Sequence, residues 1–135
     1  MDRIGVVGTS YRTAHVDELA AAALPAEFEH EQLVDLARLA GFSELVYLGT
    51  CNRVEFYFRG DTRIHTNPLL FHLRRSLADL TDGNTQLPDD DRLYIHFGRK
   101  AVRHLFRVTS ALDSMMVGEA QIAGQAKEAH ERAHN

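Results

Sequence analysis

The chain of 135 residues and 15.2 kDa has the size of one domain. Its 44% hydrophobic and 25% charged residues are typical of a soluble globular protein and exclude disordered, collagen-like and coiled-coil architectures. The single cysteine, Cys51, excludes an internal disulfide, and a net charge of −4 argues against a generally basic nucleic-acid binder. No apolar run reaches the roughly eighteen residues of a membrane span, and the N-terminus lacks a signal-peptide pattern. We therefore expect a cytoplasmic protein with no membrane segment.

Strands and helices alternate along the first half of the chain. Residues 4–7 and 44–48 are short, nearly continuous apolar runs, which are typical of strands covered on both faces. Between them a helix is predicted, with Gly41 as its C-cap. Four apolar residues share one face of this helix: Leu33, Leu36, Ala37 and Ala40.

The next strand is predicted over residues 53–59, where apolar and polar side chains alternate. Val54, Phe56 and Phe58 share one side, and Glu55 and Tyr57 share the other. This alternation is typical of a strand that is covered on one face only.

The second half continues with a helix that has Pro68 in its first position and Thr66 or Asn67 as its cap. Its apolar face is marked by Leu69 or Leu70, Leu73, Leu77 and Leu80. The composition of residues 81–91 predicts a loop, followed by a strand over 92–96. A helix over 101–108 comes next, and a last helix begins near Glu119. Between these two helices, the polar residues from Ser110 onward are expected to form a loop that leads into a helix N-terminus.

This order of elements predicts an α+β fold, a sandwich in which helices pack on a small, mostly antiparallel sheet with a ferredoxin-like arrangement. The last helix keeps its periodicity up to the end of the chain, without a glycine cap or a following proline. We therefore expect residues 1–135 to be one domain excised from a longer protein. A helix that frays at a natural C-terminus is the alternative.

Cys51 lies in a tight connection between two predicted strands. A lone cysteine is by default a small buried hydrophobe. Here, however, its neighbours Thr50, Asn52 and Arg53 are polar, and the arginine charge favours the nucleophilic thiolate. A cysteine nucleophile usually works with a histidine, and His104 is the candidate, with a half-buried structural role as the alternative.

A zinc-protease pattern near the end of the chain does not predict a metal site. His130 and His134 are spaced i, i+4 with Glu131 beside the first, but the third ligand is missing. We interpret this segment as a solvated helix face and expect no metal site in the chain.

Three motifs resemble glutamyl-tRNA reductase in order and spacing: Thr50-Cys51-Asn52-Arg53, Ala101-Val102-x-His104-Leu105-Phe106-Arg107-Val108, and Leu112-Asp113-Ser114-Met115-x-x-Gly118-Glu119-x-Gln121-Ile122-x-Gly124-Gln125. The opening Gly8-x-x-x-Arg12-Thr13-Ala14 is similar too. The resemblance covers only the N-terminal catalytic domain of that family. The NADPH-binding Rossmann domain and the helical dimerisation domain would follow, and the chain contains no Gly-x-Gly-x-x-Gly motif.

The resemblance implies the first committed step of tetrapyrrole biosynthesis from glutamate. Cys51 would attack the ester carbonyl of glutamyl-tRNA, expel the tRNA and form a glutamyl thioester. NADPH, bound by a domain absent from this chain, would reduce the thioester to glutamate-1-semialdehyde, so residues 1–135 alone are expected to lack reductase activity. The implied full-length enzyme is a homodimer, with glutamate-1-semialdehyde aminomutase as a channelling partner.

The resemblance also implies the roles of individual residues. Cys51 and His104 would be catalytic. The implied substrate-binding residues are Thr50, Asn52, Arg53, Ser114, Glu119, Ala120, Gln121 and Gln125. Arg53 suits the glutamyl carboxylate because its planar fork binds two oxygens, and Glu119, with Asp113, suits the ammonium group. The basic residues considered for tRNA contacts are Arg74, Arg75, Arg99, Lys100 and Arg103.

The chain departs from the family pattern at four positions. Tyr11 stands where the family usually has His, His15 where it has Pro, Gly49 where it has Ser, and Ala120 where it has Pro. None of these departures removes Cys51 or His104.

Two other functions stay open at this point. The chain could be a non-catalytic α+β ligand-binding or regulatory domain in which Cys51 is inert packing. It could also be a redox-independent cysteine acyltransferase or esterase that uses Cys51 and His104.

Overall fold

The computed structural model of the chain describes residues 2–61 and 65–115. The last helix expected from Glu119 and the His130–His134 pattern lie outside these residues. None of the helices in this described part combines the length and the hydropathy that a membrane span requires.

Four strands form one antiparallel sheet: β1 (Asp2–Ser10), β2 (Phe42–Thr50), β3 (Arg53–Asp61) and β4 (Tyr94–Phe97). Their order across the sheet is β2-β3-β1-β4, so the long strand β1 lies between β3 and β4. This is the order of a ferredoxin-like sheet. The predicted α+β class is therefore confirmed, and all four predicted strands are present.

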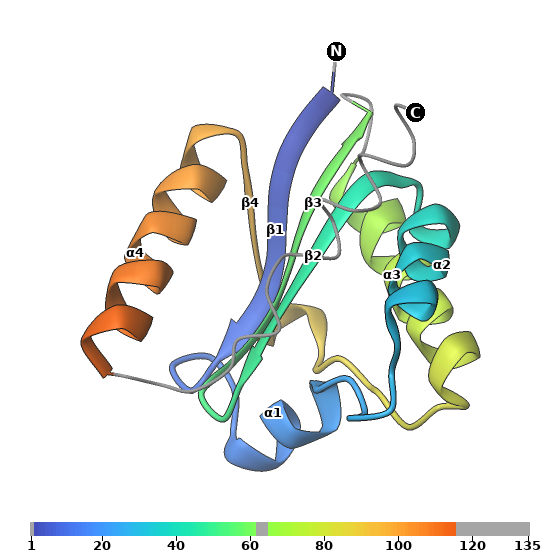
Figure 1. The fold of residues 1–135 in the computed structure, drawn as a ribbon, viewed down its shortest axis with the longest axis horizontal. Helices are drawn as coiled ribbons and strands as arrows, with labels where there is room; N and C mark the ends of the chain where they lie inside the picture. Colours follow the sequence, from blue (N-terminus) through green and yellow to red (C-terminus); the bar gives the residue numbers. More distant parts are fainter. Residues whose placement is uncertain (1, 62–64, 116–135) are drawn as a thin grey trace.

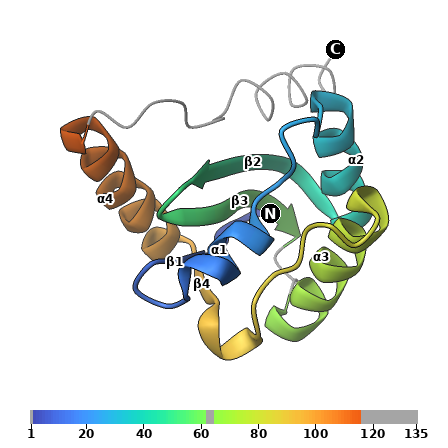
Figure 2. The same cartoon turned by 90° about the horizontal axis from the view of Figure 1, so that it is seen from below.

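Within residues 2–61 and 65–115, four α-helices accompany this sheet: α1 (Val16–Ala22), α2 (His30–Ala40), α3 (Thr66–Thr81) and α4 (Arg99–Met115). Figures 1 and 2 show α2 and α3 side by side on one face of the sheet and α4 on the opposite face. The domain therefore has three layers, with the sheet in the middle.

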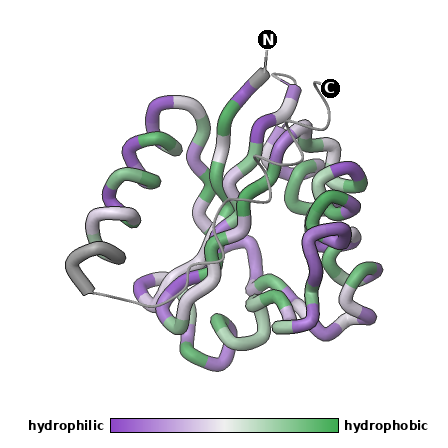
Figure 3. The backbone as a smooth tube through the Cα atoms, in the orientation of Figure 1, coloured by the Kyte–Doolittle hydropathy of each residue, from purple (hydrophilic) through white to green (hydrophobic). Residues whose placement is uncertain are grey.

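The main hydrophobic core lies between the sheet and the α2–α3 layer. Leu36 of α2 and Leu73 of α3 are fully buried against Phe56 of β3. The predicted helical stripe at Leu33, Leu36 and Ala37 belongs to this core, and Gly41 ends α2 in the left-handed conformation at φ 85°, which confirms it as the C-cap. Figure 3 shows how apolar residues run along the strands while polar and apolar bands alternate along α4.

The opposite face of the sheet is also covered, which corrects the prediction that residues 53–59 are open on one side. Val6, Tyr57, Ala101 and Val108 form a second, smaller cluster between the sheet and α4. Glu55, expected on the solvent side, is completely buried there. The alternating pattern identified the two sides of the strand correctly, but the side that carries Glu55 and Tyr57 is covered by α4, which comes much later in the sequence.

Several boundaries differ from the predictions for local reasons. Helix α1 was not predicted because it is short. Its first turn is stabilised by Glu18, whose carboxylate accepts a hydrogen bond from the His15 N–H at 3.0 Å. Helix α3 begins at Thr66 with His65 as its N-cap, so Pro68 is its third residue. A proline is tolerated there because the first N–H groups of a helix have no intrahelical acceptor.

Helix α4 is longer than predicted and includes residues 110–115, which were expected to be a loop. No glycine or proline interrupts the sequence between 99 and 115, so nothing in this segment stops the helix once it has formed. The strand predicted over 92–96 begins only at Tyr94, because Asp90–Arg92 forms a 3₁₀ turn.

Candidate active site

Cys51 lies at the tip of the β2–β3 hairpin. Thr50, the last residue of β2, pairs with Arg53, the first residue of β3, which leaves Cys51 and Asn52 as the two-residue turn. The Thr50 hydroxyl accepts a hydrogen bond from the Asn52 N–H at 3.1 Å, and the Asn52 carbonyl accepts one from the Tyr11 N–H at 2.9 Å. Cys51 itself is exposed. The turn is thus held on both sides while its cysteine faces solvent, which contradicts the reading of Cys51 as inert packing.

A buried carboxylate lies four residues after the cysteine. Glu55 of β3 is fully enclosed between the sheet and α4. Its Oε1 accepts a hydrogen bond from the Tyr57 hydroxyl at 2.9 Å, and its Oε2 accepts one from the Tyr94 hydroxyl at 2.6 Å. The Arg53 guanidinium donates to Oε2 at 3.3 Å, and Nε2 of His104 is hydrogen-bonded to the same oxygen. Side chains from β3, β4 and α4 therefore meet on one carboxylate.

These contacts keep Glu55 ionised. Burial by itself raises the pKa of a carboxyl group, but the hydrogen bonds from His104 and Tyr94 and the charges of His104 and Arg53 outweigh it and hold the pKa of Glu55 below its usual range. Burial and the neighbouring charge of Glu55 raise the pKa values of Tyr57 and Tyr94, so both phenols remain neutral hydrogen-bond donors. The ionised carboxylate therefore has a complete set of donors around it.

The absence of a side chain at Gly8 makes room for this arrangement. Gly8 of β1 pairs with Glu55 on one side and with Tyr94 on the other. A Cβ atom at Gly8 would lie 2.8 Å from Cγ of Glu55 and 3.0 Å from the Tyr94 hydroxyl oxygen. The central strand can therefore carry only glycine at this position without displacing the buried carboxylate.

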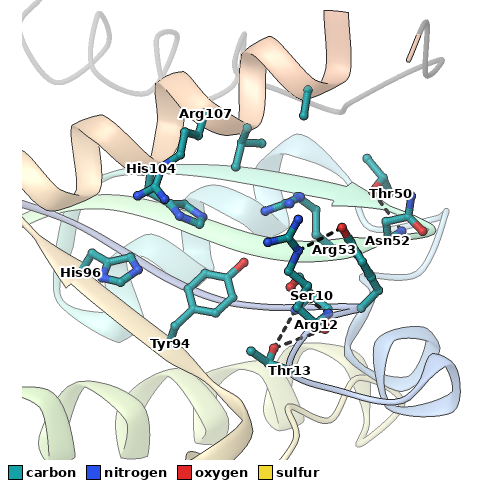
Figure 4. A pocket seen from close by; sticks show the side chains of 13 residues that line it. Ser10, Arg12, Thr13, Thr50, Asn52, Arg53, Tyr94, His96, His104 and Arg107 are labelled. Carbon is teal, nitrogen blue, oxygen red and sulfur yellow. Dashed lines mark hydrogen bonds between the residues drawn. The ribbon is translucent and has the colours of Figure 1, made fainter. Parts of the chain in front are cut away.

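A cavity of about 490 Å³ opens beside this cluster, a volume suited to a small ligand. Figure 4 shows side chains from β1 and its following loop, the β2–β3 hairpin, β4 and α4 around it. The polar and charged residues that line the cavity are Ser10, Tyr11, Arg12, Thr13, Thr50, Asn52, Arg53, Tyr94, His96, His104 and Arg107.

The structure brings together some of the predicted site residues and separates others. Thr50, Asn52, Arg53 and His104 line the same cavity. Cys51 instead lines an adjoining cavity of about 340 Å³, which is bordered by residues 23–26 and also reaches Thr50. Cys51 therefore lies at the boundary between the two cavities. Its neighbours in the sequence, Thr50 and Asn52, line the cavity that also contains His104.

The remaining predicted residues cannot be placed in the site. Ser114 belongs to the last turn of α4, and its side chain, like that of Asp113, is outside the described part. Four further predicted substrate-binding residues lie outside the described residues: Glu119, Ala120, Gln121 and Gln125.

Sequence reasoning missed Glu55, Tyr94, His96, Arg12 and Arg107 as residues of this site. One signal was available: Glu55 is the only acid in the strand segment Val54–Phe58, which is otherwise apolar or aromatic. A carboxylate in such a strand is either solvated or buried with partners, and the second case marks a functional cluster.

Comparisons with known proteins agree with the motifs. The model of the family described as glutamyl-tRNAGlu reductase, N-terminal domain, matches residues 7–135. A glutamyl-tRNA reductase of Salinispora arenicola is 45% identical over 129 residues, and that of Geobacter metallireducens is 40% identical over 129 residues. The solved structure of a glutamyl-tRNA reductase from Methanopyrus kandleri is similar with 37% identity and a TM-score of 0.53.

The matches extend over nearly all of this chain but over a small part of each relative. The alignments cover 93% and 94% of this chain for the two curated relatives and 97% for the solved structure. They cover 27%, 28% and 28% of those proteins. The chain therefore spans little more than a quarter of the length of the proteins it matches.

Replacing Glu55 by Gln should lower the free energy of unfolding by about 1–3 kcal/mol near neutral pH, because charge-assisted hydrogen bonds are lost. The folded-state pKa of Glu55 is depressed, so its contribution is present above the usual glutamate value of 4.5 and is lost as the pH falls through the folded-state pKa. Urea unfolding from about pH 7 to about pH 3 should show the gap between wild type and E55Q narrowing with acid. A gap independent of pH would contradict this account. Asp35→Asn, which removes an exposed ion pair with Arg38, is the control and should change stability by less than about 1 kcal/mol.

Replacing Gly8 by Ala should disturb the same cluster by steric means, at a cost of about 1–3 kcal/mol. Its matched control is Gly5→Ala on the same strand, whose Cβ would lie 2.4 Å from the Phe58 ring on the other face of the sheet. Both variants should be less stable than wild type. Only Gly8→Ala should also lose the pH-dependent part of the stability that comes from Glu55, as measured by the same unfolding series. Equal pH dependence in the two variants would show that Gly8 does not support the carboxylate.

Proposed function

The chain belongs to the family of glutamyl-tRNA reductase N-terminal domains, and from this membership we propose that residues 1–135 form the substrate-binding and acyl-transfer domain of a longer glutamyl-tRNA reductase. The observation that carries the proposal is the exposed Cys51 on a braced hairpin, directly beside a cavity that holds Arg53 and His104. Such a placement suits a thiol that must reach an acyl group on a large substrate.

The proposed reaction begins when the Cys51 thiolate attacks the carbonyl carbon of the glutamyl ester. A carbon–sulfur bond forms, and the tetrahedral intermediate collapses by breaking the bond to the ribose oxygen. The ribose oxygen takes up one proton and leaves with the tRNA, so the products are a glutamyl thioester and uncharged tRNA. A thiolate suits this role because it is both a good nucleophile and a good leaving group.

His104 is the proposed source of that proton. A carboxylate only accepts hydrogen bonds, so the contact with Glu55 places a proton on Nε2 of His104. Nδ1 is then the ring nitrogen left for proton transfer, and Glu55 acts as the residue that orients the ring. Because Cys51 lines the adjoining cavity, we assign His104 to the leaving group on the cavity side rather than to the thiol itself.

Arg53 is the proposed partner of the glutamyl side-chain carboxylate. Its side chain is only 18% exposed and lies inside the cavity, already oriented by Glu55. Thr50 and Asn52 would contact the same acyl group from the hairpin. Ser114, Glu119, Ala120, Gln121 and Gln125 stay predictions that rest on the family motif, with Glu119 and Asp113 proposed for the ammonium group.

The described residues do not fit a dinucleotide. Their sheet is antiparallel throughout, whereas the Rossmann type of dinucleotide site is built on a parallel βαβ unit with a glycine-rich turn. We therefore propose that NADPH, the reductant of the implied enzyme, is bound by another part of the full-length protein, and that this domain alone has no reductase activity. A cytoplasmic homodimer that passes glutamate-1-semialdehyde to its aminomutase is part of the same proposal.

A redox-independent acyltransferase or esterase is the second candidate, since the described cavity brings together Arg53 and His104, groups that suit acyl transfer. Incubation of the full-length parent with glutamyl-tRNA, with and without NADPH, separates the two functions. Semialdehyde that appears only with NADPH supports the reductase.

The central prediction is a covalent adduct on Cys51. Full-length protein mixed with glutamyl-tRNA in the absence of NADPH should carry one glutamyl group on this cysteine, as detected by mass spectrometry of its peptides. Cys51→Ala should carry none. An adduct on another residue, or no adduct on the wild type, would refute the proposed mechanism.

Arg53→Ala should raise KM and lower kcat/KM for glutamyl-tRNA by about 10- to 100-fold, the effect of losing a charged hydrogen bond. Arg53→Lys should recover part of the loss, because it restores the charge but not the planar fork. Steady-state kinetics measure both. Unchanged kinetics in Arg53→Ala would refute the pairing with the substrate carboxylate.

A further inference from the structure

The rim of the larger cavity carries two exposed arginines that the acyl-transfer chemistry does not use. Arg12 lies in the loop between β1 and α1, and Arg107 lies on α4. Figure 4 shows Arg12 close to Arg53 at one end of the cavity and Arg107 close to His104 at the other. Arg53, in contrast, is largely enclosed and paired with Glu55.

The charges around this cavity do not balance. The described residues that line it include three arginines, Arg12, Arg53 and Arg107, while Glu55, buried beside them, is the one carboxylate in contact with this set. The two acids proposed for the substrate ammonium, Glu119 and Asp113, would offset part of this charge, but their side chains lie outside the described part. Within the described part, Arg12 and Arg107 have no carboxylate of their own, which suits them to an anionic group outside the acyl part of the ligand.

Neither rim arginine is neutralised within the described part of the chain. The Arg12 Nε donates to the Tyr11 hydroxyl at 3.0 Å, which is an uncharged partner, and no ion pair joins Arg12 or Arg107 to a described acid. Arg107 also acts on His96, which lines the same cavity. Burial lowers the pKa of His96, and the charges of His104 and Arg107 lower it further.

Arg74 and Arg75, which were also considered for RNA contacts, are less suited to this role. Arg74 donates to the carbonyls of Leu87 and Pro88 and to Asp90, at 3.0, 2.6 and 2.6 Å, so it fastens the loop after α3. Arg75 also belongs to α3, which covers the sheet face opposite α4. A substrate whose ester lies at Cys51 would therefore contact the rim of the larger cavity before it contacts α3.

We propose that Arg12 and Arg107 bind phosphate groups of the single-stranded 3′ end of the aminoacylated RNA, next to the nucleotide that carries the glutamyl ester. The inference rests on the proposed function and adds a second subsite to it: Arg53 inside the cavity takes the acyl carboxylate, and the two exposed arginines at the rim take the backbone. The Tyr11–Asn52 hydrogen bond ties the loop of Arg12 to the hairpin of Cys51. In the aminoacylated RNA, one ribose separates the ester from the nearest phosphodiester. A cationic side chain beside the Cys51 hairpin is therefore suitably placed to bind that phosphate.

The test is the salt dependence of binding. In full-length protein carrying Cys51→Ala, which prevents acyl transfer, the dissociation constant for glutamyl-tRNA is measured between about 50 and 200 mM KCl. Each single-strand phosphate contact contributes roughly 0.7 to the slope of log K against log salt, so Arg12→Ala with Arg107→Ala should reduce the slope by about 1.4. A reduction smaller than about 0.7, less than one contact, overturns the proposal.

The matched control is Arg38→Ala with Arg59→Ala, which removes the same charge from two arginines that pair with Asp35 and Glu44 and do not line the cavity. It should leave the slope unchanged, and an equal reduction in the control would show a general charge effect and overturn the proposal. Arg12→Lys with Arg107→Lys keeps both charges and should restore the slope, which guards against a folding defect in the alanine variant.

Two further arms identify the source of the phosphate and separate this inference from the function on which it rests. The loss of Cys51 acylation in the Arg12/Arg107 alanine variant should be larger with glutamyl-tRNA than with glutamyl ethyl ester, which has no phosphate; equal losses overturn the proposal. A change in the KM for NADPH without a change in the RNA slope would assign the arginines to the dinucleotide and also overturn it. If wild-type Cys51 forms no adduct with glutamyl-tRNA, the proposed function fails whatever the slopes are.

Discussion

The site depends on one buried charge, the carboxylate of Glu55 between the sheet and α4. An unpaired carboxylate in such a place costs several kcal/mol of stability, so the fold is stable only with donors for it. Tyr57, Tyr94, Arg53 and His104 supply them from two strands and one helix. The same contacts that make the burial tolerable also fix the orientation of His104 and Arg53. Stability and site geometry are therefore two consequences of the same set of hydrogen bonds.

The two faces of the sheet differ because of this charge. The face under α2 and α3 is filled by leucines and phenylalanines and contributes packing. The face under α4 has a small apolar cluster and a polar centre, and α4 approaches it with Ala101 and Val108 on either side of His104. The hydrogen-bonded pair of His104 and Glu55 lies between these two small side chains, beside the cavity. The three-layer architecture thus separates the stabilising core from the face that carries the candidate site.

The hairpin links the two cavities and gives Cys51 its position. Its two-residue turn is too short to move independently of β2 and β3, and the loop after β1 holds it through Asn52. The cysteine is presented to solvent while its neighbours face the larger cavity.

The amino-acid sequence determined the four strands and three of the four described helices, the α+β class, the C-cap at Gly41 and the place of Cys51 between two strands, because periodicity and turn residues are local properties. Helix α1 was missed because it is short. The motifs around Cys51 and His104 also identified the family without any knowledge of the structure. Only the tertiary structure decided that Glu55 is buried, that Arg12 and Arg107 share a cavity rim, and that Cys51 faces a different cavity from His104. The period of two in a strand separates its two sides, but whether a side is covered depends on α4, which begins at Arg99, far along the sequence from the end of β3 at Asp61. The chemistry of this domain depends on that long-range packing.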